Sequence, residues 1–156
     1  MNIYFGFDPA NTHAIDENKT LPIITIFREP YETVLSLKTW QYEQTGIMFN
    51  DAYKHYNSFF SYMLNHADLI VDFNELINDP ESVLDKISRK YDLIKLDIPK
   101  KYLERTEATS PGDSSKNSKF YKRMKDAMPK QNKDMFAADL LHHQILQRIK
   151  NIDSMI

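Results

Sequence analysis

The stretch that decides the fold covers residues 23–36 and reads IITIFREPYETVLS. It opens as an unbroken apolar and β-branched run, which is typical of a strand buried on both faces in a parallel sheet. Pro30 suits the first position of a helix, where a missing N–H group costs nothing. The apolar residues that then recur at roughly helical spacing are Val34, Leu35, Leu37 and Trp40. The sequence therefore predicts a strand that runs directly into a helix.

The junction between this strand and helix is suited to binding an anion. The first N–H groups of a helix, together with its dipole, point beyond the carboxyl end of the strand, where open α/β sheets bind phosphorylated ligands. Arg28 lies at this junction and can bind a phosphate through two charge-assisted hydrogen bonds. The hydroxyl of Ser36 can supply a further contact to the same phosphate. The alternative interpretation is that Arg28 pairs with Glu29, Glu32 or another carboxylate. In that case Ser36 is a small packing residue.

A second strand and a covering helix are predicted further along the chain. Residues 68–73 read DLIVDF and form a strongly apolar strand. After residues 74–78, Asp79 is expected to cap an amphipathic helix that opens at Pro80 and runs to about Tyr91. The predicted fold class is therefore α/β, with a small, mostly parallel sheet covered by helices.

The central part of the chain is predicted to be helical. The helix that starts at Pro30 should run to about Gln44, with Gly46 as its stop. Asn50 can cap a second helix that runs to about Asn65. The residues that recur at helical spacing in this second helix are Tyr53, Tyr56, Phe59, Phe60 and Met63. An aromatic stripe of this kind is far more often core than a cofactor site, so it predicts a buried face.

The rest of the chain carries weaker signals. Residues 2–7 alternate and are rich in aromatic side chains, which predicts a short strand. Residues 94–104 are expected to contain an extended piece, and residues 105–118 a mobile, exposed loop because they are polar and rich in Ser. Two helices should close the chain, over about residues 119–128 and 133–150. The apolar residues of the second helix are predicted on one side and are Phe136, Leu140, Leu141, Ile145 and Ile149.

Composition limits the classes of protein and site. A chain of 156 residues corresponds to a single domain, residues 1–156. No apolar run approaches the roughly 20 residues needed to span a bilayer, and the first residues lack the pattern of a signal peptide. Cysteine is absent, which excludes disulfides, zinc–cysteine sites and thiol catalysis. The expected compartment is the cytoplasm.

Charge is distributed unevenly along the chain. The formal net charge is -2, yet residues 1–94 hold 7 basic and 14 acidic side chains, whereas residues 95–133 hold 11 basic and 5 acidic ones. A basic segment is usually a solvated face, but it can also attract an anionic nucleotide or acceptor. Among the basic residues only Phe120 and Tyr121 could stack on bases, so no nucleic-acid partner is expected.

The strand-to-helix junction carries the pattern Arg28-x-Pro30-x5-Ser36 after an apolar strand. This pattern resembles the 3′-phosphate-binding segment of the sulfotransferases that use 3′-phosphoadenosine 5′-phosphosulfate. The acidic residue before the proline and the Leu-Ser at the end look closest to the bacterial, phage and carbohydrate-type branches. The resemblance implies that Arg28 and Ser36 both hold the 3′-phosphate of the nucleotide.

A second segment resembles a later part of the same family. In sulfotransferases a strand ends in an aromatic residue and is followed by an acidic-Leu pair, a short turn, and Asp-Pro at the start of a helix that closes with a Leu. The chain reproduces that order with Phe73, Glu75-Leu76, Asp79-Pro80 and Tyr91-Asp92-Leu93. Together the two segments span roughly residues 13–93. They imply a three-layer sandwich, a truncated form of the P-loop-NTPase-like sulfotransferase fold.

The resemblance also implies roles for residues outside these segments. His13 lies on the connection before the arginine strand and is the candidate general base, because imidazole with a pKa of about 6.5 accepts a proton near neutrality. Some branches use a glutamate, so Glu17 is the alternative base. A late loop that folds over the 3′-phosphate would supply Ser114, Ser115, Lys116 and Lys119. The co-substrate would be 3′-phosphoadenosine 5′-phosphosulfate, the acceptor a hydroxyl or an amine, and no metal would be needed.

The family's loop for the 5′-phosphosulfate has no counterpart before Arg28. That loop is rich in Gly, Ser and Thr, whereas Gly6 is the only glycine in residues 1–27. We therefore expect either a fragment of a longer enzyme or a reduced relative that has lost the donor loop. The expected function is a sulfotransferase-family protein that binds the nucleotide and transfers sulfate. The alternatives are a non-catalytic nucleotide-binding or interaction module, and a P-loop kinase relative with the same core.

Overall fold

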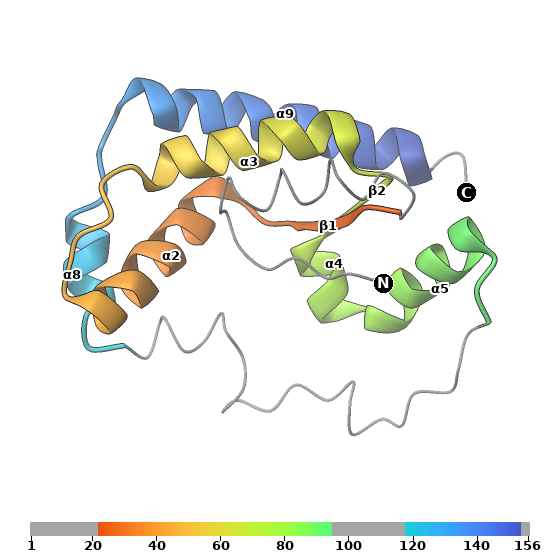
Figure 1. Ribbon diagram of the computed structural model, residues 1–156, viewed down its shortest axis with the longest axis horizontal. Coiled ribbons are helices and arrows are strands. Elements are labelled where there is room, and N and C mark those ends of the chain that lie inside the picture. Colours follow the sequence, from red (N-terminus) through yellow and green to blue (C-terminus); the bar gives the residue numbers. More distant parts are fainter. Residues whose placement is uncertain (1–21, 95–117, 154–156) are drawn as a thin grey trace.

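The computed structural model describes residues 22–94 and 118–153 of the chain (Figure 1). Over these residues the protein is mixed α/β, mostly helical, with a two-stranded parallel sheet. This confirms the predicted α/β class and the parallel pairing of the two apolar strands. The strand predicted over residues 2–7, the extended piece after residue 94 and the loop up to residue 117 lie outside the described residues. No helix of the described ranges is long and apolar enough to cross a membrane.

The two strands are short and lie next to each other. Strand β1 spans Ile24–Phe27 and strand β2 spans Leu69–Asp72, paired in parallel from the Ile24–Leu69 rung to the Phe27–Asp72 rung. A parallel pair needs a crossover connection, which the two helices between the strands provide. These helices and those that follow are α2 (Pro30–Thr45), α3 (Ala52–His66), α4 (Phe73–Asn78), α5 (Pro80–Tyr91), α8 (Tyr121–Asp126) and α9 (Lys133–Asp153).

Helices cover both faces of the sheet (Figure 1). Helices α3 and α9 run side by side over one face and form a core with Phe27 and Ile70. Helices α4 and α5 lie on the opposite side, where Val83 packs with Leu69 and Val71. Successive side chains of a strand point to opposite faces. This alternation is why Ile70 joins the first core while its two neighbours join the second.

The predicted boundaries of α2 and the buried stripe of α3 are confirmed. Helix α2 begins at Pro30 and ends before Gly46, whose φ of 69° is the left-handed conformation that glycine adopts most readily. In α3 all five residues of the aromatic stripe are buried. The predicted cap of α3 was wrong, because its N-cap is Asp51 rather than Asn50, and the Asp51 side chain makes no capping hydrogen bond.

The segment after β2 is helical, where a strand end and a turn had been predicted. The Asp72 carboxylate accepts a hydrogen bond from the backbone N–H of Asn74 at 2.7 Å, and this cap starts α4 at Phe73, the residue that was predicted to end the strand. Helix α5 confirms its predicted start, since the Asp79 carboxylate accepts from the N–H of Ser82 at 3.0 Å.

The predicted apolar side of the last helix was partly wrong. Leu141, Ile145 and Ile149 are buried, but the side chains of Phe136 and Leu140 are 57% and 62% exposed. The buried residues follow a spacing of four, whereas Phe136 lies on the opposite side of α9 and Leu140 well away from the buried row. Ala138 completes the buried row instead. Hydrophobicity alone therefore did not indicate which face of α9 meets α3.

Candidate functional site

The register of the sheet brings Arg28 and Phe73 to the same edge. Phe27 and Asp72 form the last paired rung, so the next residue of each chain segment, Arg28 and Phe73, leaves the sheet at its carboxyl edge. The guanidinium carbon of Arg28 lies 4.9 Å from the centroid of the Phe73 ring, within the range of a cation–π contact. The two segments that carry the sulfotransferase resemblance therefore meet at this edge.

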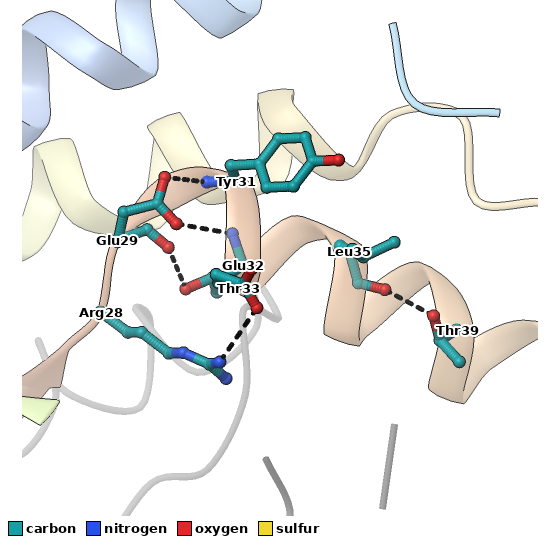
Figure 2. A network of polar contacts seen from close by, with 7 residues as sticks. All are labelled: Arg28, Glu29, Tyr31, Glu32, Thr33, Leu35 and Thr39. Carbon is teal, nitrogen blue, oxygen red and sulfur yellow. Dashed lines mark hydrogen bonds and ion pairs between the residues drawn. The ribbon is translucent and has the colours of Figure 1, made fainter. Parts of the chain in front are cut away.

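Two further contacts hold Arg28. The Tyr56 hydroxyl donates a hydrogen bond to the backbone carbonyl oxygen of Arg28 at 3.0 Å. The Arg28 Nη2 atom lies 3.5 Å from Oε2 of Glu32 (Figure 2), which is one of the carboxylate pairings that the alternative interpretation predicted. Charge-assisted hydrogen bonds usually measure about 2.7–2.9 Å, so this contact is long. The side chains of Arg28 and Glu32 are 21% and 37% exposed, so solvent reaches the pair.

The backbone N–H groups at the start of α2 are occupied, which corrects the prediction that they are free for a ligand. The Glu29 carboxylate accepts from the N–H of Tyr31 at 2.8 Å and from that of Glu32 at 2.7 Å (Figure 2). The N–H of Thr33 bonds to the carbonyl oxygen of Glu29, and Pro30 has no N–H. A carboxylate of the chain therefore takes the position that an anion would take at a helix N-terminus. Side chains, rather than these backbone N–H groups, would have to hold any anion at this edge.

Ser36 lies one helical turn beyond Glu32 on α2. Residues four apart share a face of a helix, so Ser36 and Glu32 lie on the side of α2 that the Arg28 guanidinium approaches. Ser36 is partly buried, and no hydrogen bond of its hydroxyl occurs within residues 22–94 and 118–153.

Lys119 lies near the other end of α2. Its Nζ is 5.0 Å from the centroid of the Phe120 ring, and that ring packs edge-on against Tyr42 with centroids 5.0 Å apart. Tyr42 belongs to the C-terminal part of α2, whereas Arg28 precedes its first turn. The described contacts thus do not bring Lys119 together with Arg28. The predicted site residues that lie outside the described residues are His13, Glu17, Ser114, Ser115 and Lys116.

The hydroxyl groups of two tyrosines of α3 are features that the sequence analysis missed. Tyr56 holds the Arg28 backbone, and the Tyr53 hydroxyl is buried without a hydrogen-bond partner in the described structure. Burial, and then the negative charges of Glu29 and Asp139, raise the pKa of Tyr53 to about 12. The same causes raise the pKa of Tyr56. Helical spacing predicted both residues as core positions, and the bond of Tyr56 could not be predicted because Arg28 lies 28 residues away along the chain.

Lys38 is a buried cation on the core side of α2. Its residue surface is only 5% exposed, and neither a hydrogen bond nor an ion pair of Lys38 is found within the described ranges. Burial disfavours the charged form and lowers the pKa of the Lys38 amine. No sequence signal separates this lysine from the exposed ones, since its position on the helix alone decides its burial.

A hollow of about 360 Å³ lies along α5, away from Arg28. Its lining residues are Asp79, Glu81, Ser82, Asp85, Lys86 and Arg89. Several of these groups already have structural partners: Asp79 caps α5, and the Lys86 amine lies 2.6 Å from the Glu75 carboxylate on α4. The mixed charges of this hollow are thus part of the α4–α5 packing, and they favour no single class of ligand.

No family model matches the sequence, and neither a curated protein nor a solved structure matches it. A function for this chain therefore has to be inferred from its own residues. The arrangement that carries chemical information is the edge of the sheet. There a partly exposed arginine is held by a hydrogen bond to its backbone carbonyl and by a cation–π contact with Phe73.

Proposed function

We propose that this chain is a sulfotransferase-family protein that binds the 3′-phosphate of 3′-phosphoadenosine 5′-phosphosulfate through Arg28 and Ser36. The observation that carries the proposal is the position of Arg28 at the carboxyl edge of a parallel sheet, where α/β proteins bind their ligands. Among residues 22–94 and 118–153, one guanidinium nitrogen of Arg28 has a carboxylate contact, and that contact is long. A guanidinium has five N–H donors, so Arg28 has more donors than this contact with Glu32 uses.

The finer fold assignment belongs to the same proposal. We infer a P-loop-NTPase-like core of three layers from the parallel pair, its helical crossover and the helices on both faces of the sheet. The Asp79-Pro80 start of α5 supports this inference, because the sulfotransferase pattern implies a helix that starts there.

The reaction of the family defines what this site would have to do. A hydroxyl or amine of the acceptor attacks the sulfur, a bond from sulfur to the acceptor forms, and the bond from sulfur to the 5′-phosphate oxygen breaks. The nucleotide leaves with that electron pair, and the acceptor proton passes to a base, His13 or Glu17 in this proposal. Arg28 and Ser36 would anchor the opposite end of the nucleotide. Transfer also requires a 5′-phosphosulfate loop, so nucleotide binding is the part proposed for this chain alone.

A second candidate function is a non-catalytic interaction module. Two observations favour it: Glu32 pairs with Arg28, and the Glu29 carboxylate caps the helix N-terminus. Both carboxylates lie where an anionic ligand would otherwise interact. A module that has no nucleotide to bind would be stabilised by such internal partners.

Calorimetric titration separates these functions. The ligands are adenosine 3′,5′-bisphosphate, adenosine 5′-monophosphate and ATP, tested on the wild-type chain and on Arg28→Ala and Ser36→Ala. Arg89→Ala is the matched control, because Arg89 is an exposed arginine on α5. The proposal expects a preference for the bisphosphate that Arg28→Ala lowers by at least about 30-fold, the effect of removing a charge-assisted pair worth about 2 kcal/mol. Arg89→Ala should bind like the wild type.

The other outcomes of the titration are equally informative. A chain that binds none of the three ligands supports the interaction module, and a preference for ATP supports a P-loop kinase relative. The single tryptophan, Trp40, gives a second readout, because it lies one turn beyond Ser36 on α2 and is 58% exposed. A nucleotide bound between Arg28 and Ser36 should change its fluorescence, and Arg28→Ala should remove that change.

A further inference from the structure

We propose that Phe73 is a positioning residue whose ring holds the Arg28 guanidinium at the sheet edge, where Arg28 can exchange the Glu32 carboxylate for a ligand phosphate. This inference rests on the proposed function and adds to it a residue that does not touch the ligand. Three observations carry it: the backbone placement of Phe73, the cation–π contact of its ring with Arg28, and the long contact between Arg28 and Glu32.

The backbone fixes Phe73 opposite Arg28. Parallel pairing ends at the Phe27–Asp72 rung, and the Asp72 carboxylate then caps α4 by accepting from the N–H of Asn74 at 2.7 Å. Phe73 is thereby the first residue of α4, held between a sheet rung and a helix cap. Strand β2 and helix α4 therefore place its ring at the edge of the sheet. A residue held by regular secondary structure can position a neighbouring side chain precisely.

The contact of Arg28 with Phe73 differs in kind from a contact with a phosphate. A guanidinium is planar: its flat face stacks on aromatic rings, whereas its N–H groups point outward from its edge and bind carboxylates or phosphates. The Phe73 centroid lies 4.9 Å from the guanidinium carbon, within the range of a cation–π contact, which is an attraction between charge and ring rather than a hydrogen bond. The contact with Phe73 can therefore persist when the edge of Arg28 changes partner.

Glu32 is the partner that would be exchanged. It meets Arg28 through one contact of 3.5 Å between partly exposed side chains four residues apart, a kind of pair that contributes little free energy. A phosphate carries more negative charge and can accept two hydrogen bonds from the same edge. Phe73 and Glu32 therefore act on phosphate affinity in opposite directions, although both contact the same guanidinium.

The test compares Phe73→Leu, Phe73→Trp and Glu32→Gln with the wild-type chain by titration with adenosine 3′,5′-bisphosphate and adenosine 5′-monophosphate. Phe73→Leu should weaken binding of the bisphosphate about threefold to fivefold, the effect of losing an exposed cation–π contact, and should leave the monophosphate unchanged. Phe73→Trp should restore the affinity, and Glu32→Gln should strengthen it about twofold. In an Arg28→Ala background Phe73→Leu should have no further effect.

Three results would overturn the inference. Phe73→Leu could bind the bisphosphate like the wild type, it could lose both nucleotides equally, or it could keep its effect in the Arg28→Ala background. A readout that needs no ligand is the NMR chemical shift of the Arg28 Nε–H group. The ring current of Phe73 should move this shift away from its ordinary value, and Phe73→Leu should bring it back to that value. If the wild-type chain binds no bisphosphate, the proposed function fails. The positioning contact is tested separately: it would be overturned if Phe73→Leu left the Arg28 resonance unchanged.

Discussion

The hydroxyl of Tyr56 on α3 donates a hydrogen bond of 3.0 Å to the backbone carbonyl oxygen of Arg28, a residue 28 positions earlier in the sequence. This contact connects the residue that follows β1 to the helix that covers one face of the sheet. It fixes the backbone of the candidate ligand-binding arginine independently of its side chain, so a change at Tyr56 should affect both stability and the site.

Tyr56→Phe is expected to lower the free energy of unfolding by about 1–2 kcal/mol, because the Arg28 carbonyl oxygen loses its donor. Urea denaturation followed by circular dichroism measures this change. Tyr53→Phe is the matched control, since its hydroxyl is buried without a partner in the described structure. Removing that hydroxyl should leave stability unchanged or raise it by up to about 1 kcal/mol. Equal losses in the two variants would contradict the role of the hydrogen bond.

Stability is expected to fall at alkaline pH because of buried tyrosines. Burial is the main cause that raises the pKa of Tyr53 and of Tyr91 to about 12 each, above the ordinary value of 10. Between these values the unfolded chain releases the protons and the folded chain keeps them. The contribution of these two tyrosines to the free energy of unfolding is therefore complete below pH 10 and is lost as the pH rises toward about 12. Circular dichroism against pH should show a higher alkaline midpoint for Tyr53→Phe, and an unchanged midpoint would contradict this account.

Lys38→Met is expected to raise the free energy of unfolding by about 1 kcal/mol at neutral pH, because it removes a buried charge that has no partner within the described ranges. The pKa of Lys38 is lowered, so the folded chain sheds this proton before the unfolded chain does. The charge therefore destabilises the fold at neutral pH and less so as the pH approaches 10.5. The gain from Lys38→Met should shrink accordingly. Lys54→Met, at an exposed lysine paired with Asp51, should bring no gain.

Glu29→Ala is expected to lower stability by about 1 kcal/mol, because the N–H groups of Tyr31 and Glu32 lose their acceptor. The freed N–H groups should then bind an anion at the start of α2. Thermal unfolding with and without sulfate checks both effects, and sulfate should raise the midpoint of Glu29→Ala more than that of the wild type. Glu29→Asp keeps a carboxylate at the cap and should behave more like the wild type. An equal response of Glu29→Ala and the wild type to sulfate would contradict the capping role.

Local chemistry explains which parts of the fold could be predicted. Pro30 and Gly46 mark the ends of α2 because one lacks an N–H group and the other accepts a positive φ. Asp79 caps α5 through its own carboxylate. The start of α4 was missed because it depends on Asp72, which reads as the end of a strand until its side chain caps the next helix. The exposure of Phe136 was missed because a helix has no preferred face until a neighbour packs against it.

By itself the sequence determined the elements around the candidate site: an apolar strand, Arg28 at its end, and a helix that starts at Pro30 and carries Ser36. These features follow from interactions between residues close together in the chain. Only the tertiary structure decided the surroundings of Arg28, because the ring of Phe73 and the hydroxyl of Tyr56 reach it through strand pairing and helix packing over long sequence separations. The tertiary structure also decided that the Glu29 carboxylate occupies the backbone N–H groups at the start of α2. A glutamate one residue before Pro30 can face solvent, a cation or the helix amides, and the backbone geometry at the junction selects the amides.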